Sequence, residues 1–296
     1  MILVAGGTGR LGTLLVNRLV NRHLPVRVLT RQPARAEHLA GDLVTVVSGD
    51  VRDPETLAPA TAGVDVVVSA VHGFTDPHRN SLAAVDRDGN AKLIEAAKRA
   101  GADLVLMSTV GATADSPMEL FRMKHAAEQD AAASGVPTTI VRATAFLELW
   151  IDLINQTAGR SGRPLVFGRG QNPINFVAVA DVAAVVDQAV IDPTTRGKTL
   201  EIGGPDNLTF DELAQAVQTA ARRPGTPRHI PPFMLRLMAN SIGYVKPELG
   251  RQARAALAMD HTDLTFDPTR LHQLYPALPC TTLADVLARN GTEHTA

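Results

Sequence analysis

The stretch that decides the fold is Ile2-Leu3-Val4-Ala5-Gly6-Gly7-Thr8-Gly9-Arg10-Leu11-Gly12, at the beginning of the chain. Its first four apolar residues predict a buried strand, and the residues after Gly9 begin a helical pattern. Glycines between a strand and a helix permit a tight turn, close approach of the backbone to a pyrophosphate, and close helix packing. Because a helix N-terminus also favours an anion, the stretch predicts a dinucleotide-binding turn. The alternative is an ordinary turn.

Short apolar runs recur downstream and are separated by segments with helical spacing. Leu11, Leu15 and Leu19 form one such helical stripe, and Leu93 and Ala97 belong to another that Gly101 closes. The runs are apolar on both faces, as in the buried strands of a parallel sheet. The pattern predicts an α/β fold with a doubly wound parallel sheet of the Rossmann type. The expected strands span residues 2–5, 26–30, 44–47, 64–70, 103–108 and 138–142.

The alternation of strand-like and helix-like segments becomes less regular after Arg142. We expect residues 1–150, with strands and a helix from about 175–204 added, to form the dinucleotide-binding Rossmann domain. From Pro205 the pattern is mostly helical, and Thr209 stands where a helix N-cap is expected. Residues 205–296 therefore predict a smaller, mostly helical substrate-capping lobe.

The composition limits the classes of partner that the protein is expected to bind. With 29 basic and 30 acidic residues the net charge is −1, so no overall field favours nucleic acid or an anionic membrane, and a small-molecule substrate is expected. No apolar run approaches the ~20 residues of a membrane span. Cys280 is the only cysteine, which excludes an internal disulfide and fits a cytoplasmic protein. No metal-site spacing is evident, and the oligomeric state stays open, a homodimer included.

The end of the second strand bears on the choice of cofactor. An NAD site carries an acidic residue about twenty residues past the glycine turn, but here the sequence is Leu29-Thr30-Arg31. Arg31, with Arg10 and Arg35, can instead pair with a 2′-phosphate. We therefore expect NADP(H) in preference to NAD(H). The alternative is that these arginines are solvated surface residues.

Further candidate residues follow the other strands, whose carboxyl ends bind ligands in open α/β sheets. Asp50 can accept from an adenine amino group while Val51 packs on the ring, although an ordinary Asp turn explains the same residues. Ala70-Val71-His72 ends the fourth strand, and Ser108-Thr109 ends the fifth. The predicted cofactor contacts are Gly6, Thr8, Gly9, Arg10, Leu11, Gly12, Arg31, Arg35, Asp50, Val51, Ala70, Val71, Ser108, Thr109, Lys124, Thr144 and Phe146.

Several motifs together resemble the atypical short-chain dehydrogenase/reductases, in particular the NmrA-like group with type 2 quinone oxidoreductases and isoflavone-reductase relatives. They are the glycine turn, Gly49-Asp50-Val51-Arg52-Asp53, Ser108-Thr109-Val110-Gly111-Ala112, Lys124 with Glu128, the run from Arg142 to Glu148, Asp181-Val182-Ala183 and Gly203-Gly204-Pro205. The resemblance covers most of the chain. It is specific for the fold and much less so for the reaction.

The resemblance implies a role for Lys124 but not for the residue four positions before it, where the wider superfamily has a tyrosine. In the wider superfamily a Tyr-x-x-x-Lys pair works: the tyrosine passes a proton and the lysine holds the nicotinamide ribose. Here Leu120 stands four residues before Lys124, and Tyr244 and Tyr275 have no such lysine. Lys124 is thus expected at the nicotinamide ribose, near Ser108 or Thr109. Glu128, one turn on, is expected to pair with it; the alternative is a solvated surface pair.

A hydride acceptor that needs no strong acid suits this site, so we expect an NAD(P)H-dependent oxidoreductase that reduces a quinone or conjugated enone. Lys124 and His72 are the candidate catalytic residues, and His125 is a second candidate for proton relay. The alternatives are a non-catalytic redox sensor or regulator, and a structural role in a larger complex. The candidate substrate contacts, for several of which a plain core position is the alternative, are His72, Phe74, Met118, Phe146, Trp150 and Phe176.

Overall fold

The computed structural model describes residues 1–73, 81–223, 225–242 and 247–293. The chain divides into two compact units, the first made of Met1–Ala143 and Ala180–Ile202, the second of Thr144–Val179 and Gly203–Ala296. In the described part of the chain, no helix has the length and apolarity to cross a membrane.

The first unit is built on a parallel sheet of seven strands among the described residues. Chain order and spatial order diverge between β1 and β4, which lie side by side although two strands separate them in sequence. This is the topological switch point at which α/β sheets bind ligands. The strands lie in the order β10 (Thr199–Ile202), β6 (Thr138–Ala143), β5 (Asp103–Thr109), β4 (Val66–Ser69), β1 (Ile2–Ala5), β2 (Val26–Thr30) and β3 (Val44–Ser48).

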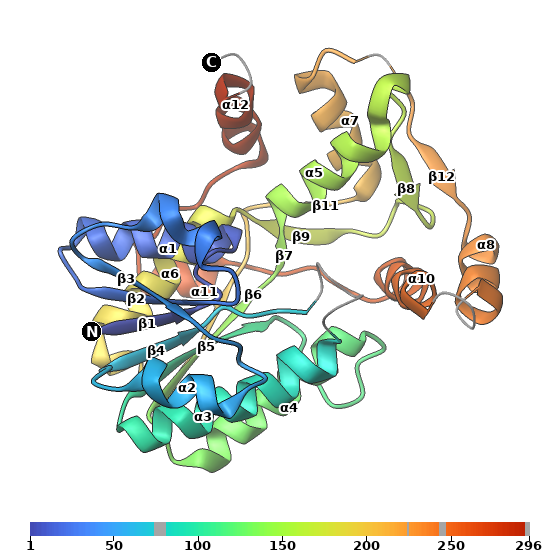
Figure 1. Ribbon diagram of the computed structural model, residues 1–296. Coiled ribbons are helices and arrows are strands. Elements are labelled where there is room, and N and C mark those ends of the chain that lie inside the picture. The colour runs from blue at the N-terminus through green and yellow to red at the C-terminus, as the bar shows by residue number, and fades with distance from the viewer. Residues whose placement is uncertain (74–80, 224, 243–246, 294–296) are drawn as a thin grey trace. The chain divides into compact units, whose positions relative to one another are not determined.

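Helices cover both faces of this sheet, which confirms the predicted doubly wound fold (Figure 1). The predicted stripe of α1 (Arg10–Asn21) is buried at Leu11, Leu15 and Leu19. On the same face lies α6 (Val179–Ile191), and the other face carries α2 (Pro54–Thr61), α3 (Asp88–Ala100) and α4 (Glu119–Ser134). Short helical turns complete the unit: η1 (Pro33–Leu39), η2 (Ala83–Arg87) and η4 (Pro193–Thr195).

Gly101 ends α3 as predicted. Its φ of 67° is left-handed, which a glycine adopts without the steric penalty of a side chain, and its N–H donates to the Lys98 carbonyl.

The core between α2, α3, α4 and the sheet is continuous and apolar, with Leu3, Leu57 and Leu93 fully buried.

The second unit contains two small sheets as well as helices. One sheet has the order β11 (Asn207–Leu208), β9 (Ile174–Val177), β7 (Ala145–Phe146), and the other pairs β12 (Arg228–Ile230) with β8 (Leu165–Phe167). The helices and turns are α5 (Leu147–Ala158), η3 (Gly159–Ser161), α7 (Phe210–Ala220), α8 (Pro232–Leu237), η5 (Met238–Ile242), α10 (Pro247–Met259), α11 (Thr269–Leu274) and α12 (Leu283–Glu293).

The bounds of this unit differ from those expected. The strands expected from about residue 175 are placed with the dinucleotide-binding domain by the sequence, whereas β9 pairs with β7 and β11 and carries Ile174 and Phe176 into the core of the second unit. Thr209 caps α7 as predicted: its hydroxyl accepts from Glu212 N at 3.2 Å, and the Glu212 carboxylate accepts from Thr209 N at 2.8 Å. That this unit caps a substrate stays a prediction.

Candidate functional site

The glycine turn requires glycine where the sequence predicts it. Gly6 has a φ of +86°, and a side-chain carbon there would stand 2.7 Å from the Ala70 carbonyl oxygen. A side chain on Gly12 would overlap the Gly6 carbonyl oxygen and come within 2.6 Å of the Gly7 Cα. The turn therefore brings β1, the first turn of α1 and the end of β4 into close backbone contact, as a pyrophosphate cradle requires.

The N-terminus of α1 is open to an anion. Gly9 is the N-cap, and among the described residues no side chain caps it and no acidic residue lies in the first turn. The backbone N–H groups there carry the positive end of the helix dipole. The predicted turn residues thus fit a phosphate group, with Thr8 half-buried and Arg10 exposed beside it.

The residues predicted at the adenosine end flank this turn. Arg31 directly follows β2 and is exposed, as is Arg35. The Asp50 carboxylate accepts from Arg52 Nε at 3.0 Å, and that hydrogen bond is the main cause that lowers its pKa. Partial burial opposes the shift, while the charges of Arg52 and Arg31 favour it. An adenine amino group would have to share the Asp50 oxygens with Arg52.

Lys124 and the residues after β4 come together in the first unit. The Lys124 side chain is 9% exposed; its Nζ lies 2.9 Å from Asp86 Oδ1 and donates to the Val71 carbonyl at 3.1 Å. The other Asp86 oxygen accepts from Gly73 N at 2.8 Å. The structure thus brings together α4 and the loop after β4.

Asp86 is the residue that sequence reasoning missed. It is fully buried on η2, a π-helical turn directly before α3. Its carbonyl accepts from Asn90 Nδ2 at 2.8 Å, and Asn90 Oδ1 accepts from Ser69 Oγ at 2.5 Å. The one available signal was an aspartate inside the apolar stripe of a predicted helix, where a buried charge needs a partner.

The expected pair between Lys124 and Glu128 is wrong. Glu128 is buried and accepts two hydrogen bonds from Arg142 on β6, at 2.9 Å and 2.6 Å, and Arg142 also reaches Glu201 on β10 at 3.1 Å. The hydrogen bond to Glu128 is the main cause that raises the Arg142 pKa. A guanidinium on the adjacent strand offers a two-pronged contact that the lysine cannot match, and Lys124 has its own carboxylate in Asp86.

Two histidines stand near Lys124 in the chain or in space. The His72 side chain is exposed, but desolvation by the surrounding protein still lowers the pKa of its imidazole. The charge of the Lys124 ammonium lowers this pKa further, and the charge of the Asp86 carboxylate opposes the shift. The imidazole is therefore neutral at pH 7. His125 follows Lys124 on α4, and its Nδ1 is buried without a hydrogen-bond partner among the described residues.

The carboxyl end of β5 also carries an unsatisfied group. The Ser108 hydroxyl is buried, and within the described parts of the chain it has no hydrogen-bond partner. Thr109 next to it donates long hydrogen bonds to the Ala143 carbonyl, at 3.3 Å, and to the Val110 carbonyl, at 3.4 Å. A buried hydroxyl at this edge of the sheet is what a ligand hydroxyl or amide could satisfy.

The other predicted contacts lie elsewhere or have structural neighbours. In the second unit, Thr144 donates to Asn175 Oδ1 at 2.9 Å, and Trp150 and Phe176 pack edge-on against Phe210, with centroids 4.7 Å and 5.7 Å apart. These contacts agree with the core alternative for both rings. Phe146 is half-buried on β7, and Met118 is buried at the start of α4. Phe74 and Tyr244 lie outside the described residues.

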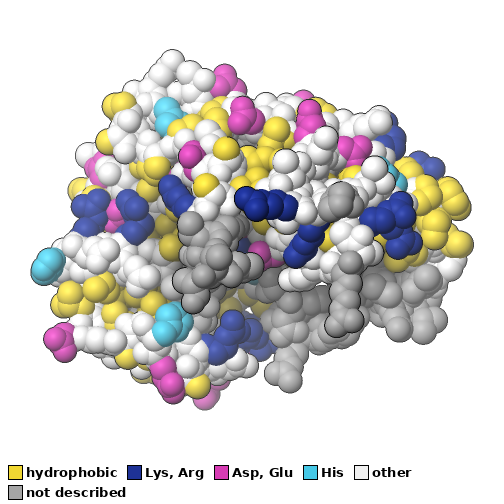
Figure 2. Space-filling model, turned by 90° about the horizontal axis from the view of Figure 1, so that it is seen from above, with side chains coloured by type: hydrophobic (Ala, Val, Ile, Leu, Met, Phe, Trp, Pro, Cys, Tyr) yellow, Lys and Arg dark blue, Asp and Glu magenta, His cyan; other side chains and the backbone are white. Residues whose placement is uncertain are grey.

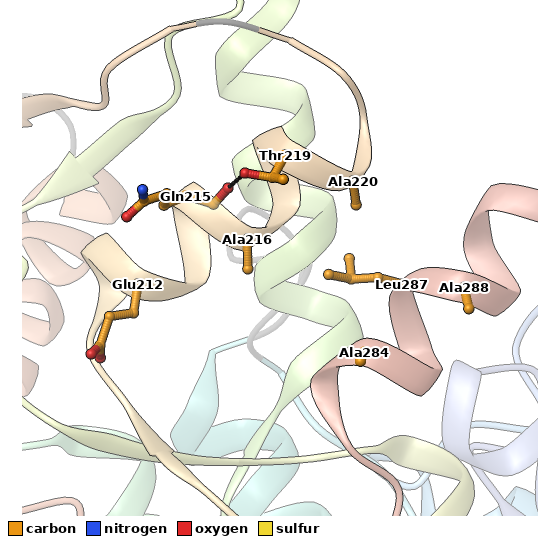
Figure 3. Close-up of a pocket in the computed structure, with 8 residues that line it drawn as sticks. All are labelled: Glu212, Gln215, Ala216, Thr219, Ala220, Ala284, Leu287 and Ala288. Carbon is orange, nitrogen blue, oxygen red and sulfur yellow. Dashed lines mark hydrogen bonds between the residues drawn. The ribbon is translucent and has the colours of Figure 1, made fainter.

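A groove between α7 and α12 is lined by none of the predicted site residues. It has a volume of about 750 Å³ and is lined largely by small apolar side chains, among them Ala216, Ala284 and Leu287 (Figure 3). Its one carboxylate, Glu212, is engaged in the cap of α7. The charged and polar network of the first unit is therefore the candidate site.

A strand, glycine turn and helix at a topological switch point define the first unit as a Rossmann dinucleotide-binding protein. Comparison with known families agrees: the NAD(P)H-binding family matches residues 6–193. The chain therefore belongs to the NAD(P)H-binding family, and the resemblance to NmrA-like atypical short-chain dehydrogenase/reductases is confirmed.

Individual relatives span nearly the whole chain. An NAD(P)H azoreductase of Xenophilus azovorans is 31% identical over 97% of this chain and 90% of its own length. The photosystem II assembly factor Ycf39 of Trieres chinensis is 26% identical over 90% of this chain and 85% of its own. The solved NADPH complex of the NADPH-dependent quinone oxidoreductase from Escherichia coli has a TM-score of 0.79 at 23% identity, covering 98% and 99% of the two chains.

Proposed function

We propose that the protein is an NADPH-dependent reductase that transfers hydride to a small, planar, electron-poor acceptor such as a quinone, a conjugated enone or an azo compound. The observation that carries this proposal is the Lys124 ammonium, held at the carboxyl end of β4 beside the glycine turn. The azoreductase relative supports the reaction class.

Different residues of the first unit would bind different parts of the cofactor. The Gly6–Gly12 turn and the N-terminus of α1 would hold the pyrophosphate. Lys124 would donate to a ribose hydroxyl at the nicotinamide end, as the family resemblance implies. When bound, NAD(P)H supplies the hydride; the acceptor gains that hydride and then one proton, and the oxidised cofactor leaves.

The acceptor class follows from the groups that can supply the proton. Leu120 cannot donate one, and the lowered pKa of His72 leaves its imidazole neutral at pH 7. Quinones, conjugated enones and azo groups accept hydride before the proton arrives, so water suffices as its source. A plain ketone needs an acid in the transition state and should be a poor substrate.

The preference for NADPH rests on the residue after β2. Arg31 occupies the place where an NAD site carries a carboxylate, and Arg10 and Arg35 are also exposed and cationic. A 2′-phosphate would gain charge-assisted hydrogen bonds from such a group, whereas a 2′-hydroxyl would not.

A second candidate function is a redox sensor that binds the cofactor without turning it over. Two observations favour it: leucine at position 120, and a relative of similar coverage whose name describes an assembly factor. The two proposals share the cofactor site and differ only in turnover.

The test is NADPH oxidation with a panel of quinones, enones, azo dyes and simple ketones, run beside calorimetric titrations of NADPH and NADH. We expect turnover with the first three classes and little with ketones. Tight NADPH binding without turnover on any acceptor would contradict the reductase and favour the sensor. Absence of binding would contradict both.

A further inference from the structure

A buried ion pair between Asp86 and Lys124 lies under the loop that follows β4. Asp86 is fully buried and the Lys124 side chain is 9% exposed, with 2.9 Å between Oδ1 and Nζ. Removing both charges from water is costly, and apolar residues of similar volume commonly stabilise a fold as well or better. Stability alone is therefore a weak explanation for the pair.

The pair closes a ring of contacts with the loop. Lys124 Nζ donates to the Val71 carbonyl at 3.1 Å, and Asp86 Oδ2 accepts from Gly73 N at 2.8 Å. A side chain on Gly73 would meet the Ser81 carbonyl oxygen at 2.9 Å, so the backbone is tightly placed there. Through Asp86, the ammonium and the loop that carries His72 are fixed to each other.

Asp86 is held through its backbone carbonyl as well as through its carboxylate. Its carbonyl accepts from Asn90, which in turn accepts from Ser69 at the end of β4. The residue lies on a π-helical turn, a distortion frequently found at functional sites. The anchoring fixes the carboxylate relative to the strand whose end forms the candidate site.

The charge balance also selects what Lys124 can bind. Among the described residues its Nζ forms an ion pair with Asp86 and donates one hydrogen bond, to the Val71 carbonyl, so at least one of its three donor hydrogens is not engaged. Because the carboxylate neutralises the ammonium, the remaining hydrogen suits a neutral hydroxyl better than a phosphate. That preference fits a ribose.

We propose that Asp86 is a positioning residue, which holds Lys124 and the Val71–Gly73 loop in the arrangement that binds and orients the nicotinamide end of the cofactor. The proposal rests on the proposed function for its kinetic part only. Its binding part needs nothing more than a dinucleotide site.

The experiment compares Asp86→Asn with Asp187→Asn in the full chain. Asp187 is equally buried and is paired with Arg22 at 2.9 Å and Arg18 at 3.3 Å, but it joins α6 to α1. Both variants lose the charge of a buried, ion-paired carboxylate, although the arginines that face Asp187 are half-exposed, and both should lower Tm. In Asp86→Asn the side-chain amide oxygen can still accept from Gly73 N, so the change is concentrated on Lys124.

We expect Asp86→Asn to weaken NADPH binding about 10-fold and to lower kcat about 10- to 100-fold with an unchanged acceptor KM, because misplaced groups cost rate steeply. Asp187→Asn should leave Kd and kcat within 2-fold. Lower Tm in both variants, with Kd and kcat of Asp86→Asn also within 2-fold, would overturn the proposal.

A second variant covers the case in which Asp86→Asn does not fold. Asp86→Glu keeps the charge and moves the carboxylate by one methylene, so kcat should fall while Kd changes less; wild-type values for both would overturn the proposal. If the wild type reduces no acceptor, the proposed function fails, and the NADPH Kd of Asp86→Asn against Asp187→Asn still decides this inference.

Discussion

Two buried carboxylates, Asp86 on η2 and Glu128 on α4, contact cations in different ways. Near the switch point, Asp86 holds Lys124, whose ammonium also binds the loop after β4. Toward the sheet edge, Glu128 holds Arg142 in a two-pronged contact, and Arg142 extends to Glu201 across β6 and β10. The edge pair joins α4 to β6 and β10, whereas the central pair holds the loop that follows β4. Burial and charge alone do not distinguish a candidate binding site from a structural ion pair; the second partner of the cation does, which is the loop after β4 for Lys124 and another carboxylate for Arg142.

The surface carries no single dominant charge on the face shown in Figure 2. Figure 2 shows basic, acidic and apolar side chains intermixed on the face that it presents. This mixture agrees with the net charge of −1. The chemistry of the first unit is thus carried by a few placed groups rather than by a broad field.

The glycine turn should give the largest effect. Gly12→Val places a side chain against the Gly6 carbonyl and the Gly7 Cα, so NADPH affinity should fall by more than about 100-fold, measured by calorimetry. Gly41→Ala is the matched control, because a side-chain carbon there meets nothing within 4 Å. Equal NADPH affinity in Gly12→Val and wild type would contradict the cradle.

Breaking the central pair from its cationic side should have the next largest effect. Lys124→Met leaves Asp86 buried and unpaired, which should cost about 3–5 kcal/mol of unfolding free energy, and kcat/KM should fall about 100-fold. Adding Asp86→Leu should restore much of the stability without restoring activity. Recovery of activity in the double variant would show that the pair acts only on stability.

Arg31 should control which cofactor binds. Arg31→Ser is expected to weaken NADPH about 10-fold and to leave NADH unchanged, since only the 2′-phosphate loses a charge-assisted contact. The edge arginine Arg196, which donates to Asp103 at 2.7 Å, is the comparison: Arg196→Ser should lower Tm and change both affinities equally. Parallel losses of NADPH and NADH in Arg31→Ser would refute a role for Arg31 in cofactor choice.

The smallest effect concerns pH. Because the pKa of His72 is lowered in the folded protein, below its unfolded value of about 6.5 the unfolded chain takes up a proton that the folded chain does not. Stability is therefore lost as pH falls from 7.5 to 5.5, and His72→Asn should lose less, by about 2 °C of Tm or under. Identical Tm changes in both proteins would contradict the lowered pKa.

Local pattern was sufficient for the scaffold and the cofactor turn. The alternation of apolar runs and helical stripes, the glycines from Gly6 to Gly12 and the cap at Thr209 all depend on neighbours within a few residues. A helical spacing also suggested that Glu128 pairs with Lys124, and there the local rule failed. The i, i+4 contact is weak, and it competes with any better partner from another element.

Only the tertiary structure decided what surrounds Lys124. Asp86 lies 38 positions away in sequence, and no local spacing relates the two residues. They meet because α3 and α4 cover the same face of the sheet and a π-helical turn presents Asp86 beside the end of β4. The sequence by itself determined the fold and the turn for the dinucleotide, since these follow from backbone sterics and hydrophobic periodicity. The partner of a buried charge is chosen by three-dimensional proximity and by the cost of leaving that charge unpaired.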